Sequence, residues 1–125
     1  MDIEAIQNDQ MPRALGPYSH VVRAGDLYIV AGQAGLDPAT GDVPPGDFLA
    51  EGRMAFENLR RVLAAAGLGL DRVVRTTVYL TAAEDFPALN ELFAEHFPAS
   101  PPTRATPIVS LPRNLRISIE AIAAG

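Results

Sequence analysis

The alternation of apolar and polar positions near the start of the chain predicts two strands. The stretch YSHVVRAGDLYIVAGQAG is expected to form two strands joined by a tight turn at Ala24-Gly25-Asp26. Gly25 supplies the positive φ of such a turn at little cost. The second strand, Leu27 to Ala34, is apolar on both faces, which favours a central position in a sheet. The segment LDPATGDVPPGD that follows is dense in Pro, Gly and Asp and is expected to be a loop.

A helix is expected next, because apolar residues then recur at helical spacing. Asp47 is a suitable N-cap, and Gly67 is a natural C-terminal stop. The charged residues of this segment lie mostly off the apolar stripe, so we expect them to form a solvated face. The stripe consists of Ala55, Leu59, Val62, Leu63 and Ala66, and the charged residues are Arg53, Glu57, Arg60 and Arg61.

A further strand and a second helix follow. The stretch RVVRTTVYLT, Arg72 to Thr81, is rich in β-branched residues and predicts a strand. A helix is expected from about Phe86 to Phe97, where Asp85 is a candidate cap and Pro87 is tolerated in the first turn. Asn90 lies on or beside the buried stripe and needs a partner, either in a neighbouring loop or at the edge of a site. The stripe consists of Phe86, Leu89, Phe93 and Phe97.

The end of the chain predicts two more strands, at about Arg104 to Ser110 and Arg116 to Ala123, with LPRN as the turn between them. Residues two apart in a strand point to the same face. One face of the last strand is apolar and is expected to be core. The other face carries Arg116, Ser118, Glu120 and Ile122.

The order β-β-α-β-α-β-β predicts an α+β two-layer sandwich with both helices on one face of a single mixed sheet. The 125 residues are expected to form one domain, 1–125. Two helices leave the other sheet face uncovered, and a large half-apolar face rarely stays bare on a monomer. We therefore expect self-association in a closed ring or dimer, with ligand clefts between subunits.

Composition and charge restrict the partners. The net charge of −5 and the pI of about 4.8 disfavour nucleic acid, which needs a basic surface. The acidic N-terminal stretch MDIEAIQNDQ does not resemble a secretory signal, and no apolar run approaches the length of a membrane span. The expected location is the cytoplasm, with no membrane partner.

Two missing residue types restrict the chemistry further. The chain has no cysteine, so thiol nucleophiles and thiolate metal sites are ruled out. All ten basic residues are arginine, so Schiff-base catalysis by a lysine amine is excluded. His20 and His96 have no ligand-like spacing, so we expect no histidine-built metal site.

Arg104 is the strongest single candidate for a binding residue. It follows a proline-rich approach, FPASPPTR, and opens a predicted strand. Arginine holds a carboxylate through two parallel hydrogen bonds. The position of Arg104 in the sequence fits an ordinary surface arginine as well.

Six segments together resemble the RidA family (also called YjgF or endoribonuclease L-PSP) of reactive-intermediate deaminases. They cover nearly the whole chain in the right order, and several are individually distinctive. These segments are GPYSH, VAGQAGLDPATG, ENLRRVLAAAGLGLDRVVRTTVYL, DFPALNELFAEHF, PTRA and ISIEAIAA. The resemblance implies a chorismate-mutase-like fold and a homotrimer whose uncovered sheet faces form an internal barrel, with three clefts between subunits.

The resemblance also implies an activity. Members of the family hydrolyse enamine and imine intermediates such as 2-aminoacrylate to 2-oxo acids and ammonia, with no cofactor and no metal. Arg104 matches the arginine that holds the substrate carboxylate, and Tyr18 and Asn90 match residues of the cleft. Gly32 matches a glycine whose main chain approaches the ligand.

The chain departs from the family pattern at residues that the resemblance links to the positioning of the attacking water. Ser118 stands where the family has the glutamate thought to position the attacking water, and Glu120 matches a second glutamate. Ala31 replaces a serine, and Thr106 replaces a residue that is often cysteine. The segment from 104 to 111 is one residue shorter than usual and contains Pro107, which suits an edge or a break in a strand.

Three functions remain open from the sequence. The first is an enamine/imine deaminase, in which Arg104 holds the substrate and water is placed by backbone groups with Ser118 or Thr106. The second is a non-catalytic or specialised member that binds a small carboxylate metabolite, and Ser118 is its main support. The third is an endoribonuclease or translation inhibitor, which the acidic pI and the lack of paired histidines disfavour.

Overall fold

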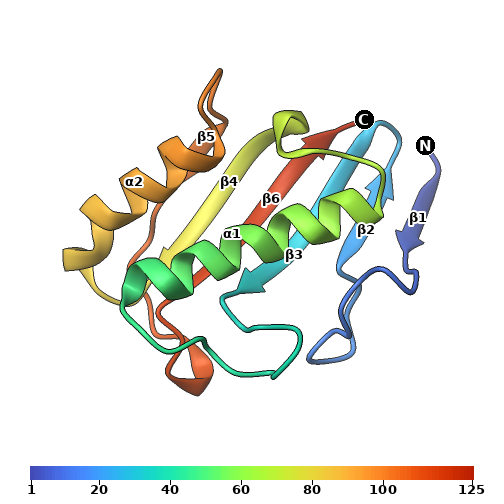
Figure 1. Ribbon diagram of the computed structural model, residues 1–125. Coiled ribbons are helices and arrows are strands. Elements are labelled where there is room, and N and C mark those ends of the chain that lie inside the picture. Colours follow the sequence, from blue (N-terminus) through green and yellow to red (C-terminus); the bar gives the residue numbers. More distant parts are fainter.

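A computed structural model describes all 125 residues as one six-stranded sheet with two helices (Figure 1). The strand order across the sheet is β1-β2-β3-β6-β4-β5. Three short 3-10 turns lie at Leu70–Arg72, Ala83–Asp85 and Pro112–Asn114. The elements are β1 (Ile3–Ile6), β2 (Val21–Ala24), β3 (Leu27–Ala34), α1 (Phe48–Ala65), β4 (Val73–Leu80), α2 (Phe86–His96), β5 (Thr103–Ala105) and β6 (Ile117–Ala124).

The predicted α+β two-layer architecture is confirmed. Both helices cover the same face of the sheet, and β6 runs through the middle between β3 and β4 (Figure 1). The sheet is mixed, because β4 and β5 are parallel while all other neighbours are antiparallel. The apolar strand β3 is an interior strand, as its sequence predicts.

Two strands differ from the sequence-based expectation. The N-terminal stretch adds a strand that was not predicted, β1, which pairs with β2 at one edge. The strand expected from Arg104 to Ser110 is only three residues long, because Pro107 ends it. It does not pair with β6 as the expected turn implied, since β4 lies between them.

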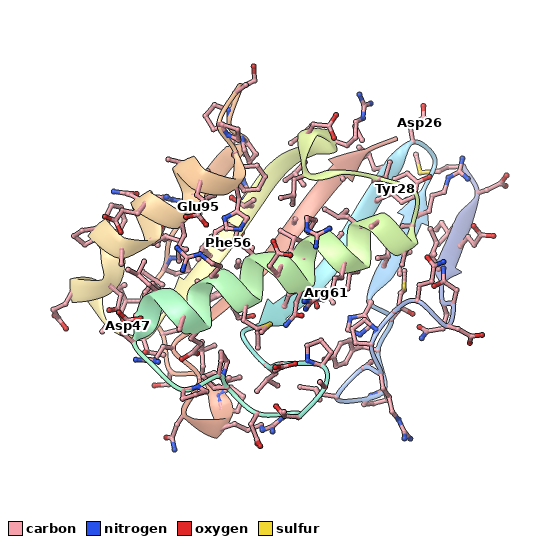
Figure 2. The ribbon with its side chains drawn as sticks, viewed as in Figure 1. Asp26, Tyr28, Asp47, Phe56, Arg61 and Glu95 are labelled. Carbon is pink, nitrogen blue, oxygen red and sulfur yellow. The ribbon has the colours of Figure 1, made fainter.

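The ends of α1 form as expected. Oδ1 of Asp47 accepts a hydrogen bond of 3.1 Å from the backbone N–H of Ala50, so Asp47 is the N-cap (Figure 2). Gly67 takes a φ of +84° just beyond the C-terminus, a conformation that costs glycine little. At α2, Asp85 occupies the N-cap position but its side chain makes no capping hydrogen bond.

The core lies between the sheet and the two helices. Phe56 of α1 is fully buried, and its ring packs edge-on to Phe93 and Phe97 and is stacked on His96 with centroids 4.6 Å apart (Figure 2). Ile117 and Ile119 of β6 are fully buried beneath the helices. Phe86 was expected in this core, but it begins α2 at the sheet edge and is 42% exposed.

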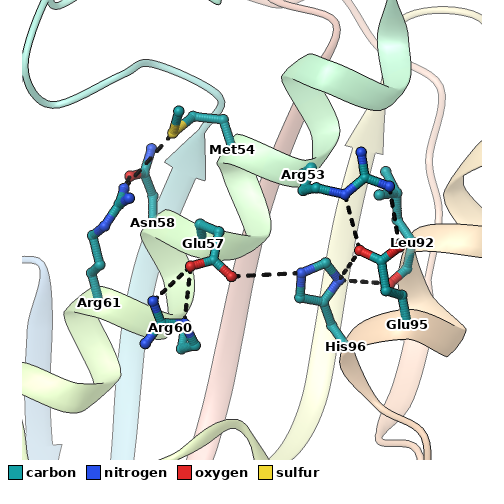
Figure 3. A network of polar contacts seen from close by, with 9 residues as sticks. All are labelled: Arg53, Met54, Glu57, Asn58, Arg60, Arg61, Leu92, Glu95 and His96. Carbon is teal, nitrogen blue, oxygen red and sulfur yellow. Dashed lines mark hydrogen bonds and ion pairs between the residues drawn. The ribbon is translucent and has the colours of Figure 1, made fainter.

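Polar side chains of α1 and α2 pair with one another (Figure 3). Arg53 of α1 pairs with Glu95 of α2 through hydrogen bonds of 3.0 and 3.1 Å. Glu57 pairs with Arg60 one turn along α1. These partly exposed groups are the solvated face that the sequence predicts.

One charged residue of α1 is buried. Glu51 is 1% exposed, and its carboxylate accepts hydrogen bonds from the backbone N–H of Arg116 (2.7 Å) and from Nε of the same residue (2.6 Å). Gly35 lies against the main chain of Glu51 so closely that a Cβ at position 35 would collide with it. Because it pairs with Glu51, the side chain of Arg116 turns toward α1. The expectation from the sequence that Arg116 shares the face of Ser118 is therefore wrong.

The opposite face of the sheet is uncovered in the single chain. Leu27 and Ile29 of β3 and Val74 of β4 are each 44–48% exposed. Ser118, Glu120 and Ile122 are only partly buried, as the alternation along β6 predicts. No helix of the chain is long and apolar enough to cross a membrane.

Candidate functional site

Arg104 of β5 and Asn90 of α2 lie together at one edge of the sheet. Nη2 of Arg104 donates a hydrogen bond of 2.8 Å to Oδ1 of Asn90. The guanidinium carbon lies 5.1 Å from the ring centroid of Phe86 and 4.9 Å from that of Phe93. These are cation–π distances, so two aromatic rings and one amide oxygen orient the guanidinium.

The guanidinium of Arg104 has no acidic partner. It appears in none of the ion pairs of the chain, and Asn90 is its one side-chain hydrogen-bond partner. Burial lowers the pKa of Arg104 from its ordinary value, although an arginine remains charged at neutral pH. A partly buried, oriented and unpaired guanidinium is suited to a carboxylate, which takes two of its N–H groups at once.

Register places Arg104 on the helix side of the sheet. It pairs with Thr76 in the parallel β4–β5 ladder, and Thr76 is fully buried beneath the helices. Ser118 pairs with Tyr79 of β4 and Ala34 of β3, on the uncovered face. Arg104 and Ser118 of one chain therefore lie on opposite faces, and a single chain does not bring the two together.

Gly32 lies directly beside Ser118. A Cβ built at position 32 would meet Oγ of Ser118 at 2.8 Å, a distance that real Cβ atoms essentially never show. Glycine is thus required for the serine hydroxyl to approach the main chain of β3. Gly32 is exposed, so its backbone is accessible.

Glu120 is engaged within the uncovered face. Its Oε1 accepts a hydrogen bond of 2.9 Å from the hydroxyl of Tyr79. That hydrogen bond to the carboxylate raises the pKa of Tyr79. Glu120 therefore contacts a tyrosine of its own sheet and not Ser118 or Arg104.

A cavity of about 220 Å³ lies at the end of β3, under the segment that precedes β2. Tyr18 is 47% exposed at this cavity, in the loop before β2 and not in the strand that the sequence predicted to begin there. Gly32 also lines it, so the cavity brings two of the predicted residues together. The other lining residues are Pro12, Arg13, Leu15, His20, Gln33, Ala34, Leu36, Asp37, Pro38, Gly41 and Asn58.

The remaining predicted residues, Ala31 and Thr106, have different surroundings. Ala31 lies where the β3–β6 register shifts between Val30 and Gln33, and its N–H donates to the carbonyl of His20 at 2.8 Å. Thr106 follows β5, is partly buried and makes no side-chain hydrogen bond. The carbonyl of Pro107 next to it accepts the N–H of Leu80.

Sequence reasoning missed three residues of these sites. Phe86 and Phe93 were assigned to the core, although an aromatic pair at helical spacing beside Asn90 also fits a support for an arginine. His20 was considered only as a metal ligand, yet it is buried beside the cavity and bonded to Gln33. The structure contains no cluster of three or more His, Asp or Glu side chains that could hold a metal ion.

Comparison with known proteins agrees with the resemblance seen in the sequence. Residues 8–125 match the family described as endoribonuclease L-PSP. The chain is 46% identical to protein DfrA of Myxococcus xanthus, over 96% of this chain and 94% of that protein. It is 40% identical to the 2-iminobutanoate/2-iminopropanoate deaminase of Mus musculus, over 96% of this chain and 90% of the mouse protein.

Solved structures give the same result for the fold. The crystal structure of Escherichia coli TdcF with bound serine superposes with a TM-score of 0.90 at 33% sequence identity. The superposition covers 98% of each chain. The two-layer fold of the present chain is therefore that of a protein crystallised with a small amino acid.

Proposed function

The chain belongs to the endoribonuclease L-PSP family, and on that premise we propose that it hydrolyses reactive enamines and imines to 2-oxo acids and ammonia. The family includes proteins named as imine deaminases at about 40% identity to this chain. The proposed substrates are of the 2-aminoacrylate type, which carry a carboxylate next to the reacting carbon. No cofactor is part of the proposal.

The observation that carries the proposal is the unpaired guanidinium of Arg104. Asn90, Phe86 and Phe93 orient it, and no acid neutralises it. A substrate carboxylate fits this position, since two parallel N–H···O bonds fix both its place and its orientation. The serine bound to TdcF is a ligand of the same chemical kind, a small molecule with a carboxylate.

We further propose that the complete site forms between copies of the chain. Arg104 and Asn90 lie at the helix side of one sheet edge, whereas Ser118 lies on the uncovered face and Tyr18 and Gly32 lie at the cavity near β3. A second copy packed on the apolar, half-exposed face would supply the groups that one chain keeps apart. A homotrimer, as the family resemblance implies, closes this arrangement symmetrically.

The proposed hydrolysis needs few catalytic groups. An enamine first tautomerises to the imine, gaining a proton at its methylene carbon and losing one from its nitrogen. A water then adds to the carbon of the C=N bond, the resulting carbinolamine loses ammonia, and the carbonyl of the 2-oxo acid remains. Imines hydrolyse readily in water, so holding the substrate and placing one water supplies most of the needed acceleration. Ser118, with its hydroxyl beside the accessible main chain of Gly32, is the proposed water-placing group.

The direct test generates 2-aminoacrylate in situ and follows its loss with and without the purified protein. We expect the wild-type protein to accelerate the loss and Arg104→Ala to remove most of that acceleration. Arg53→Ala is a matched control, because Arg53 is also an arginine near α2 but is paired with Glu95. No acceleration by the wild-type protein would overturn the proposal.

A second candidate function is binding of a small carboxylate without catalysis. The observation that favours it is that no carboxylate lies at Ser118, since Glu120 is bonded to Tyr79. Calorimetry with 2-oxo acids distinguishes the two: binding that Arg104→Ala abolishes, with no deaminase activity, supports this candidate. Equal binding by Arg104→Ala would contradict it.

A further inference from the structure

Asn58 of α1 is a buried polar side chain that the proposed reaction does not use. It is 6% exposed, and its Nδ2 donates hydrogen bonds of 2.8 Å to the carbonyl oxygens of Ala34 and Leu36. Its Oδ1 accepts a hydrogen bond of 2.7 Å from Nη1 of Arg61 (Figure 3). Carbonyls only accept and a guanidinium only donates, so all three partners agree on the orientation of the amide.

Arg61 strengthens this arrangement. Its guanidinium is partly buried and makes no ion pair, and its two partners are Oδ1 of Asn58 and Sδ of Met54 at 3.7 Å. A hydrogen bond from a charged donor polarises the amide, and hydrogen bonds in a chain strengthen one another. The N–H groups of Asn58 are therefore stronger donors to the two carbonyls than those of an isolated amide.

The two carbonyls belong to the segment that leaves β3, residues 34–36. Gly35, in the middle of this segment, packs so closely on the main chain of Glu51 that it has no room for a side chain. Glu51 and Asn58 are seven residues apart in α1 and lie on one face of the helix, two turns apart. The segment is therefore held on α1 at two points, and Asn58 supplies the directed hydrogen bonds.

The turn that follows, residues 37–42, is closed by its own hydrogen bonds. The backbone N–H of Asp37 donates to the carbonyl of Asp42 at 2.8 Å, and the N–H of Gly41 donates to the carbonyl of Asp37 at 2.7 Å. The side chain of Asp37 also accepts the N–H of Ala39. A turn bonded in this way moves as one body, so its position depends on where it is attached to the rest of the chain.

Few contacts attach turn 37–42. Asn58 holds its root through the carbonyl of Leu36. The one hydrogen bond from elsewhere in the chain to the turn itself runs from Nη2 of Arg113 to the carbonyl of Gly41, and it is 3.3 Å long and exposed. This part of the chain borders the cavity of Tyr18 and Gly32 through Leu36, Asp37, Pro38 and Gly41. The turn is thus one wall of the candidate site, and its place depends chiefly on Asn58.

We propose that Asn58 is a positioning residue of the candidate site, which ties the root of turn 37–42 to α1 and so fixes one wall of the cavity. Asn58 also borders this cavity, but its two N–H groups and its oxygen are all engaged, so it does not hold the substrate itself. The inference deepens the proposed function and rests on it for the effect on catalysis. The attachment of the turn to α1 does not depend on the reaction.

Asn58→Asp is the decisive variant, because it keeps the shape of the side chain and the contact with Arg61 but removes both N–H donors. A carboxylate here would face two carbonyl oxygens, so we expect turn 37–42 to become mobile. Backbone ¹⁵N relaxation of the full-length protein measures this. The order parameters of the turn should be about 0.85 in the wild type and below about 0.6 in the variant, with those of α1 unchanged.

A mobile wall should appear in kcat and not in KM. Arg104 and Asn90 still hold the substrate in the variant, but the reacting carbon is less well placed for water. For 2-aminoacrylate we expect kcat of Asn58→Asp to fall about tenfold or more, while KM changes by less than about threefold.

Val73→Ala is the control for a general loss of stability. Val73 is buried in the core at the start of β4, where the register opposite β6 is Ala123. Segment 34–36 begins opposite Ser118, toward the other end of β6. The smaller side chain destabilises the fold far from turn 37–42, so the order parameters of the turn and kcat should stay at the wild-type values.

Order parameters of turn 37–42 that are the same in Asn58→Asp and the wild type would overturn the proposal. A mobile turn with an unchanged kcat would do so too. Asn58→Ala, which removes the donors without adding a charge, replaces Asn58→Asp in both measurements if that variant does not fold. If the wild-type protein has no deaminase activity, the proposed function fails, and relaxation still decides whether Asn58 holds the turn.

Discussion

Nη2 of Arg104 donates to Oδ1 of Asn90 across 2.8 Å, joining the short edge strand β5 to the middle of α2. The contact uses one N–H of the guanidinium and leaves the others without a side-chain partner. It also involves a neutral acceptor, so the positive charge stays available. An amide at position 90 therefore orients Arg104 without competing for it.

The first prediction follows from this neutrality. Asn90→Asp keeps the shape of the side chain but places a carboxylate beside Arg104, where it competes with the substrate carboxylate. We expect KM for 2-aminoacrylate to rise by about tenfold or more, with a smaller change in kcat. Glu91→Gln, on the next residue of α2, is the control and should leave KM unchanged. An unaltered KM in Asn90→Asp would show that Arg104 does not hold the carboxylate.

The second prediction concerns the close approach of Gly32 and Ser118. Gly32→Ala forces Oγ of Ser118 away from a Cβ that would otherwise lie 2.8 Å from it. We expect the free energy of unfolding in urea to fall by about 0.5–1 kcal/mol, because Oγ of Ser118 is displaced from its preferred rotamer. The double variant Gly32→Ala/Ser118→Ala should recover most of that loss, because the clashing oxygen is gone. Additive losses in the double-mutant cycle would contradict the described contact.

The third prediction compares an ion pair whose acid is buried with an exposed one. Arg116→Met leaves the carboxylate of Glu51, which is 1% exposed, without its cation but with the backbone N–H of residue 116, and we expect a loss of about 1.5–3 kcal/mol in the free energy of unfolding. Arg53→Met removes the partner of the exposed Glu95 and should cost much less. Similar losses in the two variants, measured by urea unfolding at neutral pH, would show that the Glu51–Arg116 contact is not buried in solution.

The fourth prediction concerns pH. The hydrogen bond from Arg60 lowers the pKa of Glu57 below its ordinary value of 4.5. The carboxylate of Glu57 therefore loses its proton at a lower pH in the folded state than in the unfolded chain. Its contribution to stability is present above about pH 4.5 and is lost as the pH falls through the lowered value.

Glu57→Gln tests this linkage. The difference in free energy of unfolding between the wild type and Glu57→Gln should be largest at neutral pH and should shrink as the pH falls toward 3. In an Arg60→Gln background, the same difference between the protein with Glu57 and its Glu57→Gln variant should be smaller at neutral pH, since the largest cause of the lowered pKa of Glu57 is removed. A difference that stays constant between pH 7 and 3 would be inconsistent with a lowered pKa.

The fold was largely predictable because its elements carry local signals. Asp47 and Gly67 mark the ends of α1, and the β-branched run before Leu80 marks β4. The unpredicted strand β1 has no such signal, because its residues are nearly all exposed and its pairing with β2 is decided by a distant part of the chain. Pro107 signalled that β5 is short. No residue signalled that β4 lies between β5 and β6 in the sheet.

The candidate site was only partly predictable. The composition and the family resemblance drew attention to Arg104, Asn90 and Ser118. The alternation along the last strand placed Ser118 on the uncovered face, but the sequence does not show that Arg104 lies on the opposite one. That depends on the parallel register of Thr76 with Arg104 and the antiparallel register of Tyr79 with Ser118.

The two outer strands of the sheet determine how copies of this chain can meet. β1 has four residues and β5 has three, and β5 is followed within two residues by a proline, which has no N–H to offer. Short edges with a proline give little backbone for another strand to add to, so growth of the sheet from chain to chain is disfavoured. We therefore expect copies to meet through the broad face that carries Ile29 and Glu120, where assembly can stop at a small closed number of copies.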